Sequence, residues 1–327
     1  MIHAFGLESV TRVDGTAAVM AYTDLMELND IVEFLISRRS LLALTGAGVS
    51  TASGIPDYRD LQGDWKRRQP MDFQQFTGSH AARQRYWARS MLGWPRFAGA
   101  RPNAAHMALA ALERAVAMNC LITQNVDGLH QQAGSGNVID LHGRLDRVVC
   151  LNCSSRQQRS QFQNELERLN PQWTADAVTM APDGDADLQG ADYRQFQLPA
   201  CGHCGGVLKP DVVFFGENVP RTRVAAAQQA LLECDGLLVV GSSLMVWSGF
   251  RFARAAAERG IPIVALNRGK TRADDLLWRK VDDDCLVSLK ELLALVAPAE
   301  GSALPTPVMA TAADNADPSP PESGIRS

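Results

Sequence analysis

The stretch T-G-A-G-V-S-T-A-S-G-I-P-D-Y-R-D at residues 45–60 decides the fold of this chain. It follows the apolar run 41–44, which is typical of a buried strand that delivers the chain into a glycine turn. Gly46 and Gly48 permit a tight turn and let backbone N–H groups approach a pyrophosphate. A dinucleotide-binding fingerprint has a third glycine where this chain has Thr51. From these residues alone, a nucleotide site is favoured only slightly over a plain structural turn.

Strand-like and helix-like segments alternate along much of the chain. Apolar runs of strand length occur at residues 41–44, 120–123, 138–141, 212–215, 237–240 and 261–266. Helical patterns lie between several of these runs, at residues 104–116, 221–232 and 250–259. The alternation predicts an α/β fold in which a mostly parallel, Rossmann-like sheet is covered by helices on both faces.

Five of the predicted strands lead into polar motifs. These motifs are T-G-A-G, T-Q-N-V-D, L-H-G, G-S-S and L-N-R-G. Ligands of parallel sheets bind at the carboxyl ends of the strands, so we expect the five motifs to converge on one crevice. The alternative is that they are ordinary loops, because loops are polar in general.

Composition and charge place the chain among ordinary globular proteins. Its 327 residues leave room for about two domains, and 46% of them are hydrophobic and 21% charged. The net charge of −4 gives no basic footprint for nucleic acid, and no apolar run approaches the ~20 residues needed to cross a bilayer. The first 23 residues lack the compact apolar core of a secretory signal. We therefore expect a cytoplasmic protein that has neither nucleic acid nor a membrane as a partner.

Four of the seven cysteines form two C-x-x-C pairs, Cys150 with Cys153 and Cys201 with Cys204. Two such knuckles supply the four thiolates that tetrahedral zinc prefers, although the gap between them exceeds the usual ~15 to 20 residues. A closed four-sulfur site has no open position for water, so we expect one structural Zn²⁺. A catalytic zinc with His203 as a ligand would leave one cysteine idle, and a redox C-x-x-C would explain only one pair.

The cysteine pairs also suggest how the chain is divided. Residues 150–204 interrupt the strand–helix rhythm and are predicted to be a small zinc-binding insertion. Residues 27–149 and 205–297 then form the Rossmann-like domain. Residues 1–26 are an N-terminal extension, and residues 298–327, rich in Pro, Ala and Ser, are predicted to be a disordered tail.

Candidate proton-transfer and ribose-binding residues follow two of the predicted strands. His142 stands just after the run 138–141 and precedes Gly143, so another molecule could approach its ring and exchange a proton near neutral pH. Asn125 and Asp127 follow the run 120–123 and suit ribose hydroxyls and a carboxamide. The alternative for His142 is a structural histidine with satisfied hydrogen bonds. The sequence has no G-x-S-x-G elbow, so a serine nucleophile has no support.

Together these motifs resemble those of the sirtuins, a family of NAD-dependent protein lysine deacylases. The matching segments are G-A-G-V-S (46–50), G-I-P-D-Y-R (54–59), T-Q-N-V-D (123–127), H-G (142–143), both C-x-x-C pairs, K-P-D-V-V-F-F-G-E (209–217), G-S-S (241–243) and N-R-G (267–269). The long cysteine gap and the segment R-Y-W-A-R-S-M-L-G-W-P (85–95) are similar to the class II branch. That branch includes a mitochondrial member described as a lipoamidase, deacylase and ADP-ribosyltransferase.

The resemblance implies that the glycine turn holds NAD as a co-substrate whose bond to nicotinamide is broken, so no hydride moves. The acyl-lysine oxygen would attack the ribose, and His142 would take a proton from a ribose hydroxyl. The products would be free lysine, nicotinamide and O-acyl-ADP-ribose. The implied catalytic residues are His142, Asn125 and Asp127. The implied NAD contacts are Gly46, Ala47, Gly48, Ser50, Ile55, Pro56, Asp57, Tyr58, Arg59, Gln124, Asn125, Val126, Asp127, Gly241, Ser242, Ser243, Asn267, Arg268, Gly269 and Cys285.

The residues themselves also suggest where an acyl-lysine protein or peptide binds. We expect residues 212–215 and 244–247 to be extended segments, between which the peptide could add as a strand and contact Val212, Val213 and Phe214. Apolar walls there suit an uncharged acyl-lysine better than free lysine. Arg89 lies in a Y-x-x-R pattern like that of desuccinylase sirtuins and could pair with an acidic acyl group. An arginine within a helix is, however, more often solvated or salt-bridged.

Two alternatives stay open at the level of sequence. The same site could transfer ADP-ribose to a protein, because His142 and Asp127 would serve both reactions. The chain could instead be a noncatalytic module that binds NAD or ADP-ribose, which the presence of His142 disfavours. A dehydrogenase is disfavoured because the third glycine is missing.

Overall fold

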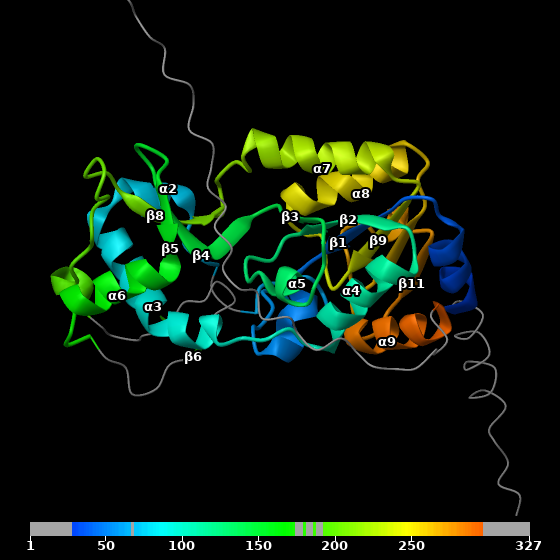
Figure 1. Cartoon of the computed structure of the whole chain (residues 1–327), viewed down its shortest axis with the longest axis horizontal. Helices are drawn as coiled ribbons and strands as arrows, with labels where there is room; N and C mark the ends of the chain where they lie inside the picture. The colour runs from blue at the N-terminus through cyan, green and yellow to red at the C-terminus, as the bar shows by residue number, and fades with distance from the viewer. Residues whose placement is uncertain (1–27, 67–68, 174–178, 181–185, 188–191, 297–327) are drawn as a thin grey trace, which may run out of the picture.

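The structure is a computed structural model that describes residues 28–66, 69–173, 179–180, 186–187 and 192–296. It has a large lobe around one sheet and a smaller lobe around a second (Figure 1). The strands of the large sheet are β1 (Leu41–Thr45), β2 (Met118–Thr123), β3 (Val138–Asp140), β9 (Gly236–Val240), β10 (Ile263–Leu266) and β11 (Arg279–Val281). They lie in the order β11-β10-β9-β1-β2-β3, and every pair is parallel. The predicted Rossmann-like sheet is confirmed.

Helices cover both faces of this sheet because alternate strand residues point to opposite sides. One face packs Ala43 and Leu238 against α4 (Ala104–Ala115), α9 (Cys285–Val296) and the helical residues 28–37. The other face packs Leu44 and Val239 against α7 (Arg221–Glu233) and α8 (Trp247–Glu258). In Figure 1, α7 and α8 lie on one side of the strands and α4 and α9 on the other.

The smaller lobe contains an antiparallel sheet of β4 (Gly143–Cys150), β5 (Arg156–Gln158) and β8 (Leu208–Val212), with β4 in the middle. The helices around it are α2 (Phe73–Gly78), α3 (His80–Ala98) and α6 (Arg159–Leu169) (Figure 1). Its core joins side chains from distant segments, and the rings of Trp87 and Phe162 have centroids 4.5 Å apart. The lobe thus includes α2 and α3 in addition to the cysteine segment 150–204 that the sequence assigned to it.

The remaining elements are short. They are η1 (Ala47–Ser53), α5 (Leu129–Gln132), η2 (Tyr193–Gln195), η3 (Asp274–Leu276) and the strand pair β6 (Thr179–Met180) and β7 (Ala186–Asp187). The expected extension 1–26 and tail 298–327 lie outside the described residues, as does most of the acidic stretch 181–187. Within the described part of the chain, no helix combines the length and apolar character needed to span a bilayer.

Two local expectations were wrong. The strand expected at residues 212–215 is β8, which ends at Val212. The search for apolar runs missed β8 because this strand contains the buried charged residues Lys209 and Asp211. Lys209 pairs with Glu217 at 3.0 Å. The segment 244–247 is not extended throughout, since Trp247 is the first residue of α8.

Candidate active site

A cavity of about 600 Å³ opens at the edge of the large sheet, beside β1 and β9. From β1 the chain adds β2 and β3 in one direction across the sheet, and from β9 it adds β10 and β11 in the opposite direction. The neighbouring strands β1 and β9 therefore form the switch point of the sheet. Ligands of open parallel sheets bind in the crevice at such a point. The small lobe supplies further walls through Tyr86, Leu145 and Phe214. The cavity therefore lies between the two lobes.

Two glycine turns meet along the large-lobe side of the cavity. The Gly46 N–H donates to Val240 O at 3.1 Å, and the Gly48 N–H donates to Gly241 O at 2.9 Å. A Cβ atom at Gly48 would lie 2.9 Å from the Cα of Gly241, which itself has a φ of 58°. Neither turn accommodates a side chain, because the backbones of the two turns pack directly against each other at the cavity wall. Ala47 begins η1, and the N–H of a first helical residue has no partner within its helix.

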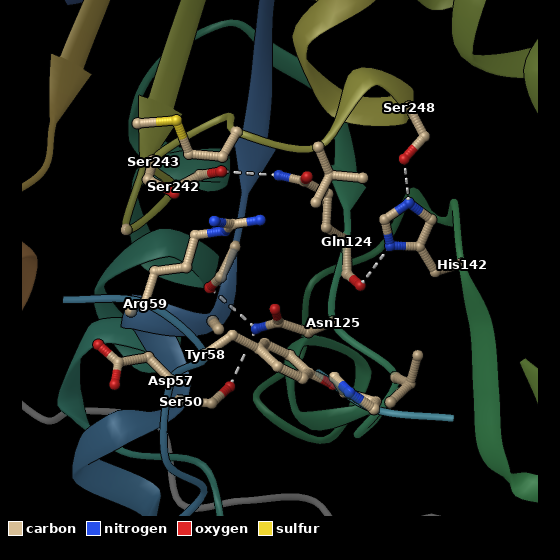
Figure 2. A pocket seen from close by; sticks show the side chains of 18 of the residues that line it. Ser50, Asp57, Tyr58, Arg59, Gln124, Asn125, His142, Ser242, Ser243 and Ser248 are labelled. Atoms are coloured by element: carbon tan, nitrogen blue, oxygen red, sulfur yellow. Dashed lines mark hydrogen bonds between the residues drawn. The ribbon is translucent and has the colours of Figure 1, made fainter. Parts of the chain in front are cut away.

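Ser50, Asn125 and Asp127 form a hydrogen-bonded group beside the first turn. Asn125 Nδ2 donates to Ser50 Oγ and to Gly46 O, both at 3.0 Å (Figure 2). Ser50 Oγ donates in turn to Asp127 Oδ2 at 2.7 Å. Burial raises the pKa of Asp127 above its ordinary value, while hydrogen bonds from the Leu129 N–H and Ser50 oppose the shift. The network fixes an amide and a carboxyl group against the glycine turn.

His142 lies on the link between the lobes, after β3 and directly before β4. Its Nδ1 is 2.9 Å from the backbone oxygen of Gln124, and its Nε2 is 2.7 Å from Ser248 Oγ (Figure 2). A carbonyl oxygen only accepts, so Nδ1 carries the proton and Nε2 presents a lone pair. Both His142 and Ser248 line the cavity. The ring therefore holds an unprotonated nitrogen at the cavity wall.

His142 should stay neutral well below pH 7. Burial lowers the pKa of His142 to about 4; the hydrogen bond to Gln124 opposes this shift, and the charges of Arg251 and Arg223 add to it. In an NMR titration from about pH 8 to about pH 5 we expect no protonation of this ring. Its resonances are assigned by their absence from His142→Ala. An inflection near the ordinary value of 6.5 would contradict the prediction.

The structure brings nearly all of the predicted site residues together. The cavity is lined by Gly46, Ala47, Gly48, Ser50, Ile55, Pro56, Asp57, Tyr58, Arg59, Gln124, Asn125, Val126, Asp127, His142, Val212, Val213, Phe214, Gly241, Ser242, Ser243, Asn267, Arg268 and Cys285. Gly269 and Arg89 are not among its lining residues. Arg89 is half-buried in α3, whereas Tyr86 of the same helix does line the cavity. The pairing of Arg89 with an acidic acyl group stays a prediction.

Sequence reasoning missed several residues of the cavity wall. Ser248 and Arg251 of α8 line it, as do the apolar side chains Met71, Phe97 and Leu145. The spacing of apolar residues could not identify the last three as cavity residues, because residues of an ordinary hydrophobic core have the same spacing. The sequence offered one further signal for Ser248, because Trp247 and Ser248 stand where many of the proteins that this chain resembles have a proline-bearing segment.

The four predicted zinc ligands gather at the end of β4 that lies away from His142. The Sγ atoms of Cys150 and Cys204 are 3.5 Å apart, those of Cys153 and Cys201 are 3.7 Å apart, and all four lie within 4.8 Å of one another. Tetrahedral zinc with Zn–S bonds of about 2.3 Å has sulfur–sulfur edges of about 3.8 Å, so this set fits the ion. Four thiolates fill the coordination sphere, which makes the zinc structural.

Comparison with curated proteins gives relatives of high identity. An NAD-dependent protein deacetylase of Xanthomonas campestris pv. campestris (strain 8004) is 62% identical over 257 residues, which cover 79% of this chain and 88% of that protein. NAD-dependent protein deacetylase 2 of Bradyrhizobium diazoefficiens is 59% identical over 261 residues, covering 80% of this chain and 96% of that protein.

Solved structures share the fold at lower identity. A Sir2–p53 peptide–NAD⁺ complex is 29% identical with a TM-score of 0.63, covering 85% of this chain and 98% of that one. A complex of a Sir2 homolog with NAD is 30% identical with a TM-score of 0.64, covering 83% of this chain and 94% of that one. Residues 46–248 match the sequence profile of the Sir2 family. With these relatives, the match shows that the chain belongs to the Sir2 family, the sirtuins.

Proposed function

We infer that this chain is an NAD-dependent protein lysine deacylase that yields nicotinamide, O-acyl-ADP-ribose and free lysine. The observation that carries this inference is the lone pair of His142 Nε2 in the cavity that the two glycine turns also line. A base beside a phosphate-binding turn is suited to remove a proton from the adjoining ribose. Bacterial relatives at 57–62% identity have the name NAD-dependent protein deacetylase, which supports the same activity.

The residues around the cavity fit NAD. The N–H groups of Gly46 and Gly48 already donate to the backbone oxygens of residues 240 and 241. The pyrophosphate would therefore lie against the backbone of these glycines and accept a hydrogen bond from the Ala47 N–H. Ser242 and Ser243 would contact phosphate or the adenosine ribose, and Asn267, Arg268, Gly269 and Cys285 the adenosine end. Bound NAD supplies a ribose carbon that accepts the acyl oxygen as nicotinamide leaves.

The polar side chains at the other end of the cavity have distinct roles. When a ribose hydroxyl loses its proton, His142 Nε2 would become protonated while Nδ1–H stays bonded to Gln124 O. Asn125 and Asp127 would hold the nicotinamide ribose and carboxamide. Their orientation is set in advance by Ser50, which bonds to both.

The acyl-lysine would enter between the lobes. Val212, Val213 and Phe214 line the cavity, and the Val213 N–H donates to His142 O at 2.8 Å, so this segment is tied to the base. Apolar walls from the small lobe suit an uncharged acyl-lysine, whereas a free ammonium group would be costly to bury. The solved Sir2–p53 peptide–NAD⁺ complex supports a peptide substrate.

Two finer assignments accompany this proposal. The long cysteine gap and the segment 85–95 support membership of the class II branch. The odd number of cysteines and the two C-x-x-C pairs support metal binding over a disulfide framework, and with it a reducing compartment such as the cytoplasm.

Mass spectrometry of acylated lysine peptides tests the proposed function. Peptides bearing acetyl, long-chain, lipoyl or glutaryl groups are incubated with the protein and NAD, and we expect free lysine together with O-acyl-ADP-ribose. Arg89→Ala is compared in parallel and should slow removal of the glutaryl group alone if Arg89 pairs with its carboxylate. Nicotinamide release with an ADP-ribose mass added to protein would favour a transferase. NAD binding without turnover would favour a binding module.

A further inference from the structure

The hydroxyl group of Ser248 is hydrogen-bonded to Nε2 of His142, the ring nitrogen that would accept a proton. Its Oγ lies 2.7 Å from His142 Nε2, and Nε2 is the ring atom without a proton, so the hydroxyl donates to the lone pair (Figure 2). A ring nitrogen has one lone pair, lying in the plane of the ring. A second hydroxyl can therefore reach Nε2 directly only if the Ser248 side chain turns away.

The backbone next to Ser248 packs against Gln124, the residue whose carbonyl oxygen also orients His142. Gln124 O holds Nδ1 of His142, and the Gln124 side chain lies against Gly249, where a Cβ atom would come within 2.3 Å of Gln124 Oε1. The first turn of α8 is therefore packed closely on the Gln124 segment. Ser248 itself is half-buried and lines the cavity, so its oxygen can still accept a hydrogen bond from a ligand.

We propose that Ser248 relays the proton between the ribose hydroxyl and His142. The ribose O–H would donate to Ser248 Oγ while the Ser248 O–H donates to Nε2. The ribose proton then moves to Ser248 Oγ as the original Ser248 proton moves to Nε2. Serine ends as a neutral hydroxyl, the ribose oxygen keeps the electron pair of its broken O–H bond, and His142 becomes an imidazolium. The relay rests on the proposed deacylase function.

Ser248→Ala tests the relay, with Ser248→Thr as the matched variant that keeps a hydroxyl. Alanine should lower kcat for acyl removal about tenfold or more, since a positioned proton-transfer group contributes at least that much. Peptide KM and the exchange of labelled nicotinamide into NAD should stay near wild type, because nicotinamide leaves before this proton moves. Ser248→Thr should restore most of kcat.

The dependence of kcat on the deuterium content of the solvent separates a relay from a structural role. Two protons in motion give a curved dependence in the wild type, and Ser248→Ala should give a straight line. Equal or faster acyl removal by Ser248→Ala would overturn the relay, because His142 would then take the proton directly. His142→Ala is measured in parallel: if it removes acyl groups normally, the deacylase mechanism itself fails, whereas an inactive His142→Ala with an active Ser248→Ala removes only the relay.

Discussion

His142→Ala should lower kcat/KM for acyl removal by a factor of about 10² to 10⁴, the contribution of a general base. Alanine removes the Nε2 lone pair, and among the described residues that line the cavity His142 is the one histidine. The backbone around it should hold, because the Leu141 N–H still donates to Thr123 O and the Val213 N–H to the residue 142 carbonyl. Quantifying deacylated peptide by mass spectrometry measures the loss, and calorimetry should show that NAD still binds.

His80→Ala is the matched control for this prediction. His80 is exposed at the start of α3 and lies outside the cavity lining, so its removal should leave turnover unchanged. If His142→Ala retained acyl removal at the level of His80→Ala, the ring would be a structural histidine and the base would have to be another group.

Removal of zinc should disable the protein by loosening the small lobe. Structural zinc sites contribute about 10–16 kcal/mol of apparent binding free energy in small peptides, so even partial loss should lower Tm by more than about 10 °C. The effect should reach the active site, because β4 carries Cys150 at one end and leads directly from His142 at the other. Cys201→Ser or treatment with a strong chelator should reduce bound zinc and abolish turnover, as followed by metal analysis, calorimetry and the peptide assay.

Cys234→Ala provides the corresponding control. Cys234 is a buried free cysteine at the end of α7, away from the zinc cluster, so this variant should keep one zinc per chain and most of its activity. A purified wild-type protein without zinc, whose activity instead followed the redox state of the four cysteines, would refute the structural-zinc assignment.

The large lobe was predictable because its signals are local. Strands such as β9, which is buried along its whole length, appear as continuous apolar runs, and α8 buries Phe252 and Ala256 at helical spacing. The glycine turn, the base and the C-x-x-C pairs each carry chemistry that needs particular residue types at a fixed spacing. The zinc site could therefore be proposed from cysteine spacing alone, whereas the glycine turn favoured a nucleotide only slightly and the NAD assignment came from the resemblance to the sirtuins.

The small lobe and part of the cavity wall were not predictable in the same way. β4 alternates buried apolar positions with arginine and aspartate, and its pairing partner β8 holds a buried lysine, so neither strand forms an apolar run. The partnership of Ser248 with His142 joins residues 106 positions apart and depends on how α8 packs against Gln124. Such contacts are properties of the folded chain, and no local pattern encodes them.

The link on which His142 lies also joins the two lobes at a single point of the backbone. The Leu141 N–H is bonded to Thr123 in the large sheet, whereas Gly143 pairs with Val212 in the small one. The imidazole itself, however, is bonded only to the large lobe, through Nδ1 to Gln124 O and through Nε2 to Ser248 Oγ. A rotation of the small lobe about this link would therefore leave the ring aimed along the glycine turns and would move the wall at Val212 and Phe214 past it. The width of the cleft could then change while the base and the nucleotide side of the cavity keep their alignment.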